Sequence, residues 1–211
     1  PHSLLSVIID DDGEEKLIDS EAELTFIREH LSPMKITYIN NKPWRSIGQK
    51  RNDMVKYAKT KIVGWMDSDD IYFPTYISHS YEILKSVRKQ GRACVGSDQM
   101  TFINTMSDDY GVYKLDCGGQ KVMCHEATLM FTKKWFAASC KFNTKDTGEG
   151  KNLIRDNENN MGFTDIMKCM VCLCHDSNTV PKDRFLEDKR KLDVNITDDV
   201  KTILESIFKK E

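Results

Sequence analysis

The chain has 211 residues, of which 39% are hydrophobic and 30% are charged, as is typical of a globular protein. Its formal net charge of -2 gives no field that would favour nucleic acid or an anionic membrane. No apolar stretch approaches the roughly 20 residues of a membrane-spanning helix. Seven cysteines without a regular framework favour free thiols in a reducing compartment, so we expect a cytoplasmic protein.

The first hundred residues alternate between apolar, β-branched segments and segments whose apolar side chains have helical spacing. Helices are predicted at 21–31, 46–58 and 74–88, and strands at 4–9, 35–39, 62–66 and 92–96. Such alternation implies a parallel sheet with right-handed crossover connections.

The pattern changes after residue 98. Short strands are predicted at 100–103, 111–115, 122–124 and 128–131, and a short helix at 133–138. Residues 143–162 carry few apolar side chains, which predicts a mobile loop with one short helix. A long apolar strand is predicted at 166–174, and a last helix is expected to begin at Thr197.

Three carboxylates, Asp67, Asp69 and Asp70, lie within four residues directly after the predicted strand 62–66. Carboxylates at the C-terminal end of a central strand lie where open α/β sheets bind ligands. In extended backbone Asp67 and Asp69 would share a face, and two converging carboxylates suit a hard cation such as Mg²⁺ or Mn²⁺. The alternative is an acidic turn whose side chains cap the helix that Pro74 opens.

Several segments together resemble the family-2 glycosyltransferases of the GT-A fold. The resemblance is carried by a first strand ending in acid, by Gly48-Gln49-Lys50-Arg51-Asn52, by Asp67-Ser68-Asp69-Asp70 with Pro74 after it, by Glu126 to Phe131 and by His175 to Thr179. The resemblance spans residues 4–180. The chain is also similar to the N-terminal glycosyltransferase domain of a large multidomain viral protein, which implies a longer protein with further domains and a location in the host cytoplasm.

The resemblance implies a single GT-A-type α/β domain over residues 1–211. A Rossmann-like, mostly parallel central sheet would be flanked by helices, with a smaller mixed sheet on the acceptor side. Residues 1–98 would form the half that binds the nucleotide-sugar, residues 99–180 the acceptor half, and residues 181–211 a C-terminal helical segment.

The resemblance also implies a metal-dependent hexosyltransferase. It would move a hexose from a UDP-sugar, such as UDP-glucose or UDP-rhamnose, to a hydroxyl of a glycan acceptor, and Mn²⁺ or Mg²⁺ would neutralise the diphosphate leaving group. Two alternatives are a nucleotidyltransferase that makes a nucleotide-sugar and a non-catalytic glycan-binding module. The first usually has a Gly-rich basic loop after strand one, whereas this chain has Asp10-Asp11-Asp12-Gly13-Glu14-Glu15 there.

Roles for individual residues follow from the resemblance. Asp69 would be the direct metal ligand, and Asp67 would contact the ribose or a metal-bound water. His175, at the end of the predicted strand 166–174, would be a third ligand and would favour Mn²⁺; alternatively it contacts the diphosphate or only ends the strand. The residues assigned to the nucleotide-sugar are Asp10, Asp11, Asn40, Arg51, Asp67 and Ser68.

Other interpretations stay open for several of these residues. Arg51 could stack on uracil or pair with the diphosphate, or it could be a solvent-facing residue of a basic helix. Asp11 is favoured to accept from uracil N3 or a ribose hydroxyl, with Asp10 and Asp12 as solvated turn residues, and Asn40 could serve only to form a turn.

Glu149 is assigned as the general base. The family often has Glu-Asp at this place, and either acid can act as the base, but this chain reads Gly148-Glu149-Gly150. The second acid is therefore missing.

The remaining His, Cys and Trp side chains suggest weaker hypotheses. Cys169, Cys172, Cys174 and His175 could suggest zinc, but in a strand Cys169 would point away from the other two cysteines. We therefore predict that the cysteines are small apolar core residues. His125 could contact the acceptor, and Trp44 and Trp135 could stack on sugar rings or simply pack.

Overall fold

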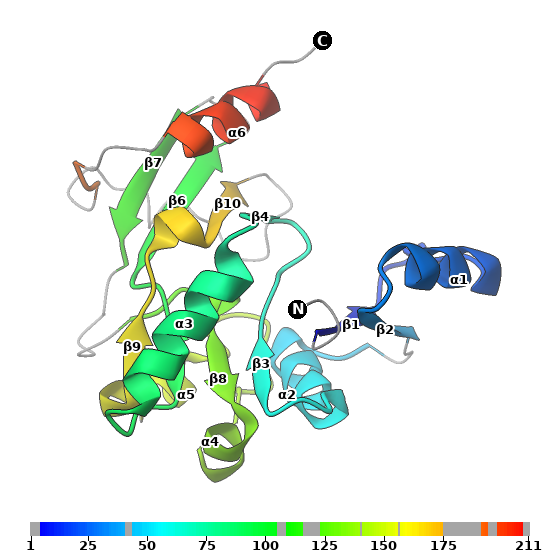
Figure 1. Cartoon of the computed structure of the whole chain (residues 1–211), viewed down its shortest axis with the longest axis horizontal. Helices are drawn as coiled ribbons and strands as arrows, with labels where there is room; N and C mark the ends of the chain where they lie inside the picture. The colour runs from blue at the N-terminus through cyan, green and yellow to red at the C-terminus, as the bar shows by residue number, and fades with distance from the viewer. Residues whose placement is uncertain are drawn as a thin grey trace. The chain divides into compact units, whose positions relative to one another are not determined.

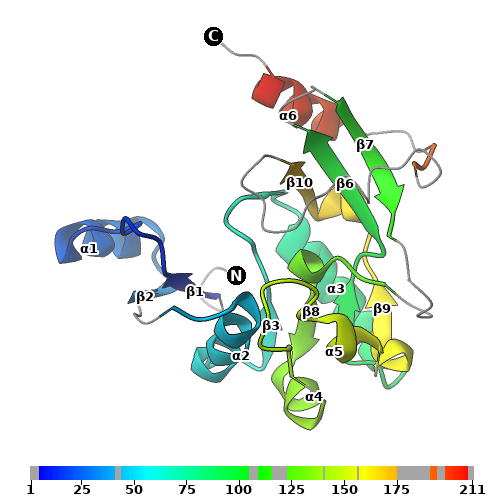
Figure 2. The ribbon, with the colours of Figure 1, turned by 180° about the vertical axis from the view of Figure 1, so that it is seen from behind.

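The computed structural model describes residues 5–40, 44–104, 109–115, 123–139, 141–155, 157–174, 191–193 and 198–208. The chain divides into two compact units (Figures 1 and 2). The N-terminal unit comprises residues 1–61 and 142–149, and the C-terminal unit comprises residues 62–141 and 150–211. These limits differ from those of the expected halves, and that functional division stays a prediction.

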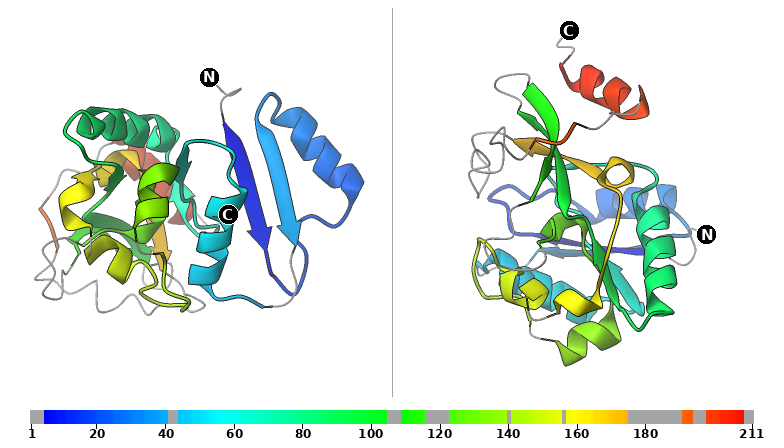
Figure 3. Two further views of the ribbon diagram at one scale, coloured as in Figure 1. Left: turned by 90° about the horizontal axis from the view of Figure 1, so that it is seen from below. Right: turned by 90° about the vertical axis from the view of Figure 1, so that its left-hand side faces the viewer.

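The N-terminal unit contains a two-stranded parallel sheet. Strand β1 (Ser6–Asp11) pairs with β2 (Lys35–Asn40) in the register Ser6↔Lys35 to Asp11↔Asn40. Helix α1 (Glu21–His30) connects the two strands and lies beside β2 (Figure 3, left). Its Leu24 packs with Ile18 and Ile36 in a small core. The parallel register places the carboxyl ends of both strands at the same edge of the sheet.

Helix α2 (Ile47–Tyr57) follows in the same unit. Ser46 and Gln49 form a capping box at its N-terminus, which fixes the first residue of the helix. The buried face of α2 carries Gly48, Arg51 and Val55, a spacing of three and four residues that places all three on one side of a helix.

The C-terminal unit contains two four-stranded sheets. The first has the order β3-β8-β5-β9 and the second the order β4-β10-β6-β7. The strands of the first sheet are β3 (Ile62–Gly64), β8 (Met130–Thr132), β5 (Cys94–Gly96) and β9 (Met161–Phe163). Those of the second are β4 (Ile71–Tyr72), β10 (Met170–Cys174), β6 (Gln99–Asn104) and β7 (Asp109–Lys114). Strand β8 runs antiparallel to both β3 and β5, which are therefore parallel to each other.

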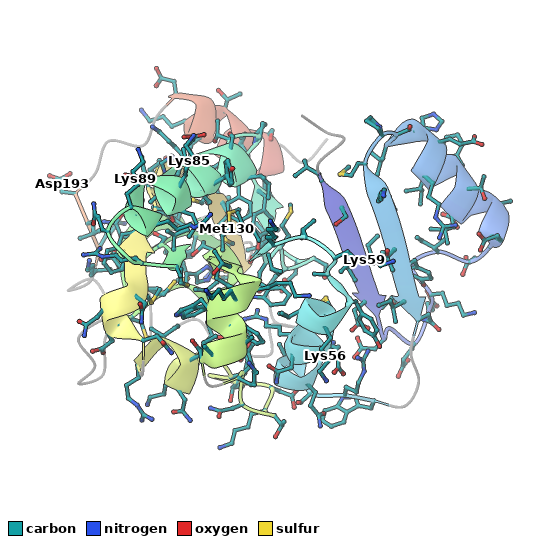
Figure 4. The ribbon with its side chains drawn as sticks, turned by 60° about the horizontal axis from the view of Figure 1, so that its bottom comes forward. Lys56, Lys59, Lys85, Lys89, Met130 and Asp193 are labelled. Atoms are coloured by element: carbon teal, nitrogen blue, oxygen red, sulfur yellow. The ribbon has the colours of Figure 1, made fainter. Side chains whose placement is uncertain are left out.

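Helices pack on both sheets of this unit. Helix α3 (Tyr76–Arg88) crosses the first sheet (Figure 1), and its Leu84 packs against Val95 and Met130, which is labelled in Figure 4. The short helices are α4 (Lys133–Ala138) and α5 (Lys151–Arg155), with 3₁₀ turns at Glu126–Thr128, Glu158–Asn160 and Ile166–Lys168. Helix α6 (Asp198–Phe208) contributes Val200 to a cluster with Val171 of the second sheet.

The α/β class is confirmed, and the helices predicted at 21–31, 46–58, 74–88 and 133–138 are present. Two details near residue 70 are wrong. The strand predicted at 62–66 ends at Gly64, and a short unpredicted strand, β4, follows at Ile71. Helix α3 begins at Tyr76, and its N-cap residue Thr75 makes no side-chain capping hydrogen bond, so no Asp side chain caps this helix.

The second half of the chain differs from the predictions at three further places. The apolar run 166–174 is divided, because the Asp165 side chain accepts from the Met167 backbone N–H at 3.0 Å and caps a 3₁₀ turn before β10. Residues 123 and 124 are not in a strand. Strand β9 was not predicted, although it pairs with β5.

Candidate active site

The acidic stretch after β3 is a turn rather than extended backbone. Trp65 is buried, Asp67 and Asp70 are half-buried, and Ser68 and Asp69 are exposed at the tip of the turn. The expected sharing of one strand face by Asp67 and Asp69 is therefore wrong, because the chain leaves the β conformation at Gly64. The turn still places these carboxylates at the C-terminal end of β3.

Asp70 fastens this turn to the second sheet. Its Oδ1 accepts from the backbone N–H of Leu173 in β10 at 3.1 Å. Burial, together with the negative charges of Asp69 and Asp67, raises the pKa of Asp70 to about 7. The three carboxylates thus repel one another, and a divalent cation at the turn would relieve this repulsion.

A single tyrosine hydroxyl connects the acidic turn to the 3₁₀ turn Glu126–Thr128. The Tyr72 hydroxyl accepts from the backbone N–H of Asp67 at 2.8 Å and donates to the backbone carbonyl of Ala127 at 3.2 Å. The Tyr76 hydroxyl donates to the carbonyl of Trp65 at 2.8 Å. Both turns are thereby held at the same edge of the first sheet.

In the N-terminal unit, the acids that end β1 are engaged by cations and by hydrogen bonds. Asp10, whose side chain is 1% exposed, binds Arg45 at 2.6 Å, and Asp12 binds Lys50 at 2.8 Å. The expectation of a solvated turn residue is therefore wrong for Asp10, whereas Asp12 is exposed as predicted. The second oxygen of Asp10, Oδ2, is buried and accepts no hydrogen bond from any residue in the described ranges.

Asp11 is part of a hydrogen-bonded group with β2. It accepts from the hydroxyl of Tyr38, which holds the pKa of Asp11 below its usual range, and from the backbone N–H of Gly13 and Leu17 at 3.1 and 2.9 Å. The amide of Asn40 donates to the Asp11 carbonyl at 3.3 Å. Asp11 and Asn40 thus lie together at one edge of the sheet, as the parallel register requires.

Arg51 and Glu149 form a buried ion pair within the N-terminal unit. The Nη1–Oε1 distance is 3.0 Å, the side chains are 7% and 8% exposed, and the Arg51 guanidinium lies 5.7 Å from the centre of the Phe142 ring. The interpretation of Arg51 as a solvent-facing residue is therefore wrong. Glu149 is engaged by a cation rather than standing free in a loop.

Residues 142–149 are fastened to α2 over their whole length. The Asn52 side chain donates to the Phe142 carbonyl at 2.9 Å and accepts from the Phe142 N–H at 3.1 Å. At the start of the helix, the N–H groups of Ile47 and Gly48 donate to the Asp146 carboxylate and the Lys145 carbonyl, each at 3.0 Å. Residues 143–149 of the predicted mobile loop are therefore held against α2 by hydrogen bonds and the Arg51–Glu149 ion pair.

The first 135 residues identify the family. The model of glycosyl transferase family 2 matches residues 1–135, which is more than half of the chain and includes both acidic strand ends. The chain belongs to glycosyl transferase family 2. No curated protein matches the chain significantly.

The chain is thus a glycosyltransferase, and enzymes of its family use a nucleotide-sugar donor and an acceptor and often need a divalent metal. Asp67 and Asp69 supply carboxylate oxygens, which are the ligands that Mg²⁺ and Mn²⁺ take. Within the described ranges, no three His, Cys, Asp or Glu side chains are placed to surround one metal ion. The predicted third ligand, His175, lies outside the described residues.

The other predicted residues of the glycosyltransferase are placed as follows. Cys169, Cys172 and Cys174 are buried in the core, as predicted. His125 is half-buried and lies beside the 3₁₀ turn Glu126–Thr128, and Trp44 is 72% exposed.

No helix in the described part of the chain has the length and apolarity needed to cross a membrane.

Sequence reasoning missed two residues that shape this region, Tyr72 and Glu126. Tyr72 gives no local signal, because its role depends on a backbone carbonyl 55 residues away. Glu126 could have been noticed as an acid in the segment that precedes β8, the strand adjacent to β3.

Proposed function

We propose that this glycosyltransferase moves a hexose from a UDP-sugar, such as UDP-glucose or UDP-rhamnose, to a hydroxyl of a glycan acceptor. The observation that carries the proposal is the turn of three carboxylates at the C-terminal end of β3, in a chain of family 2. A cation held there would attract the diphosphate of a nucleotide-sugar. The family match supports glycosyl transfer over nucleotidyl transfer or simple glycan binding.

The proposed metal ligands are Asp69, Asp67 and His175, and the proposed ion is Mn²⁺ or Mg²⁺. The ion would supply Lewis-acid neutralisation of the departing diphosphate. The two aspartates fit this role by their chemistry and by the repulsion that they exert on Asp70. Ser68, at the exposed tip of the same turn, is proposed to contact the nucleotide-sugar.

Asp10, Asp11, Asn40 and Arg51 are proposed to bind the nucleotide. The buried Oδ2 of Asp10 supports this role, because a donor such as uracil N3–H would satisfy an oxygen that accepts from no described residue. Arg51 carries the weakest support, because its guanidinium already contacts Glu149 and Phe142. If Arg51 pairs with phosphate or uracil, Arg51→Ala should weaken UDP binding by about 1–3 kcal/mol.

The sequence assigns the base to Glu149, and the turnover of Glu149→Gln is the measurement that decides between this residue and another carboxylate. A further proposal concerns the setting of the enzyme. The buried cysteines Cys94, Cys124, Cys169 and Cys172 are free thiols, which supports a reducing compartment such as a (host) cytoplasm.

The test is metal-dependent binding and hydrolysis of UDP-, GDP- and dTDP-sugars by the wild-type chain. We expect UDP-sugars to be preferred, and Mn²⁺ affinity in the presence of UDP to fall in both Asp69→Ala and His175→Ala. Glu82→Gln, which changes an exposed carboxylate on α3, is the control. Equal Mn²⁺ affinity in Asp69→Ala and wild type would refute the metal site, and loss in Asp69→Ala alone would exclude His175 as a ligand.

A further inference from the structure

The space beside Gly150 is filled by the carboxylate of Glu126. A Cβ atom added to Gly150 would lie 2.6 Å from Cδ of Glu126 and 2.9 Å from each of its carboxylate oxygens. The Glu126 carboxylate also accepts from the backbone N–H of Gly150 at 3.1 Å. Gly150 does not have a positive φ, so the backbone itself would accept a side chain at this position. The Glu126 carboxylate occupies this space and would have to move to admit a side chain.

Position 150 is the place where the chain lacks the second acid of the Glu-Asp pair. We infer that Glu126 supplies this missing carboxylate and is the general base for the acceptor hydroxyl. The inference rests on the proposed function, because it needs an acceptor that attacks a UDP-sugar.

The surroundings of Glu126 fit a base better than those of Glu149. Glu126 is half-buried, whereas Glu149 is only 6% exposed and is therefore less accessible to a substrate. A carboxylate must reach the proton that it removes directly or through one water. Glu149, enclosed beside a guanidinium, is instead arranged to hold residues 142–149 on α2.

Glu126 also lies next to the acidic turn. The carbonyl of Ala127, the residue after Glu126, accepts from the same Tyr72 hydroxyl that accepts from the N–H of Asp67. The backbone of the base and the backbone of the proposed metal ligand are therefore joined through one hydroxyl. The 3₁₀ turn that carries Glu126 is thus held beside the turn that carries the proposed metal ligands.

The proposed step balances as a single displacement. Glu126 takes the proton of the acceptor hydroxyl while the oxygen of that hydroxyl forms a bond to the anomeric carbon of the sugar. The bond between that carbon and the diphosphate oxygen breaks, and its electron pair leaves with UDP. One displacement at the anomeric carbon inverts its configuration, so an inverted product is expected.

The experiment compares wild type with Glu126→Gln, Glu126→Asp and the control Glu82→Gln. Three quantities are measured for each protein: the affinity for UDP with Mn²⁺, the turnover of the accepted UDP-sugar, and the dependence of that turnover on pH. In Glu126→Gln we expect turnover to fall about 100-fold or more with unchanged UDP affinity, and the acidic limb of the profile to disappear. Glu126→Asp keeps a carboxylate, so it should retain more turnover than Glu126→Gln and should keep the acidic limb of the pH profile. Glu149→Gln should have a lower free energy of unfolding than wild type but keep the acidic limb.

A relocation variant tests the equivalence of the two positions. Glu126→Ala combined with Gly150→Asp moves the carboxylate into the space that Glu126 vacates, and should recover at least about tenfold of the turnover lost in Glu126→Ala alone. Wild-type turnover in Glu126→Gln, a product of retained configuration, or no recovery in a folded relocation variant would overturn the role of Glu126. A wild-type chain that binds no UDP and turns over no UDP-sugar would instead overturn the proposed function itself.

Discussion

Replacement of Arg51 by Met should destabilise the protein strongly, although Arg51 stands in a helix of mostly polar residues. The substitution keeps much of the side-chain volume and removes the charge that Glu149 contacts at 3.0 Å. Because both side chains are less than a tenth exposed, the Glu149 carboxylate would stay out of water without its cation. Breaking a buried pair in this way costs about 3–5 kcal/mol.

The assay is urea denaturation followed by circular dichroism. With a slope of about 1–3 kcal/mol per molar urea, the unfolding midpoint of Arg51→Met should fall by roughly 1–5 M. The control is Lys56→Met on the same helix, labelled in Figure 4, whose ammonium binds Asp53 at 2.7 Å but whose side chain is 74% exposed. Such a surface pair contributes about 0–1 kcal/mol.

The comparison between the two helix variants decides the argument. If Arg51→Met lowers the free energy of unfolding no more than Lys56→Met does, the ion pair does not hold residues 142–149 on α2. The reasoning from burial is then refuted. A double variant, Arg51→Met with Glu149→Leu, should recover most of the loss, because an apolar pair of similar volume can replace a buried ion pair.

Three further predictions concern packing and pH. Gly48→Ala should cost about 1–3 kcal/mol in denaturant unfolding, because its Cβ would lie 1.6 Å from the backbone oxygen of Asn143. Val200→Ala, at a site that is 2% exposed, should cost about 1–3 kcal/mol in the same assay. Burial and Lys168 lower the pKa of His79, whose Nε2 accepts from the Asp165 N–H. Neutral His79 should therefore contribute fully to the free energy of unfolding above about pH 6.5, and this contribution should be lost as the pH falls through the folded-state pKa of His79. Thermal unfolding of wild type and His79→Gln from pH 5 to 7.5 should show a smaller pH dependence in the variant.

The ion pair on α2 shows where the sequence was sufficient and where it was not. Arg51 lies four residues before Val55 and three after Gly48, so its position on the buried face follows from helical periodicity. Its partner does not follow, because Glu149 is 98 residues away and lies in a segment without periodicity. The solvent-facing alternative for Arg51 arose because Lys50 and Lys56 lie nearby on the same helix.

The acidic stretch at 67–70 illustrates a second limit. Its position after a strand was readable from the apolar run, but its conformation was not. The turn depends on Tyr72 and on the β10 backbone that binds Asp70, more than a hundred residues along the chain. Local patterns therefore predicted the place of the carboxylates and not which of them is tied to the protein.

The antiparallel strand β8 explains why one edge of the first sheet can collect groups from distant parts of the chain. In a purely parallel sheet, only segments that follow strands reach the carboxyl edge. Because β8 runs opposite to β3 and β5, the segment that precedes it, Glu126–Thr128, arrives at that same edge. The chain can therefore place Glu126 beside the turn that carries Asp67, with Tyr72 between their backbones. The segment before β8 thus brings a carboxylate to the space that a side chain at position 150 would occupy.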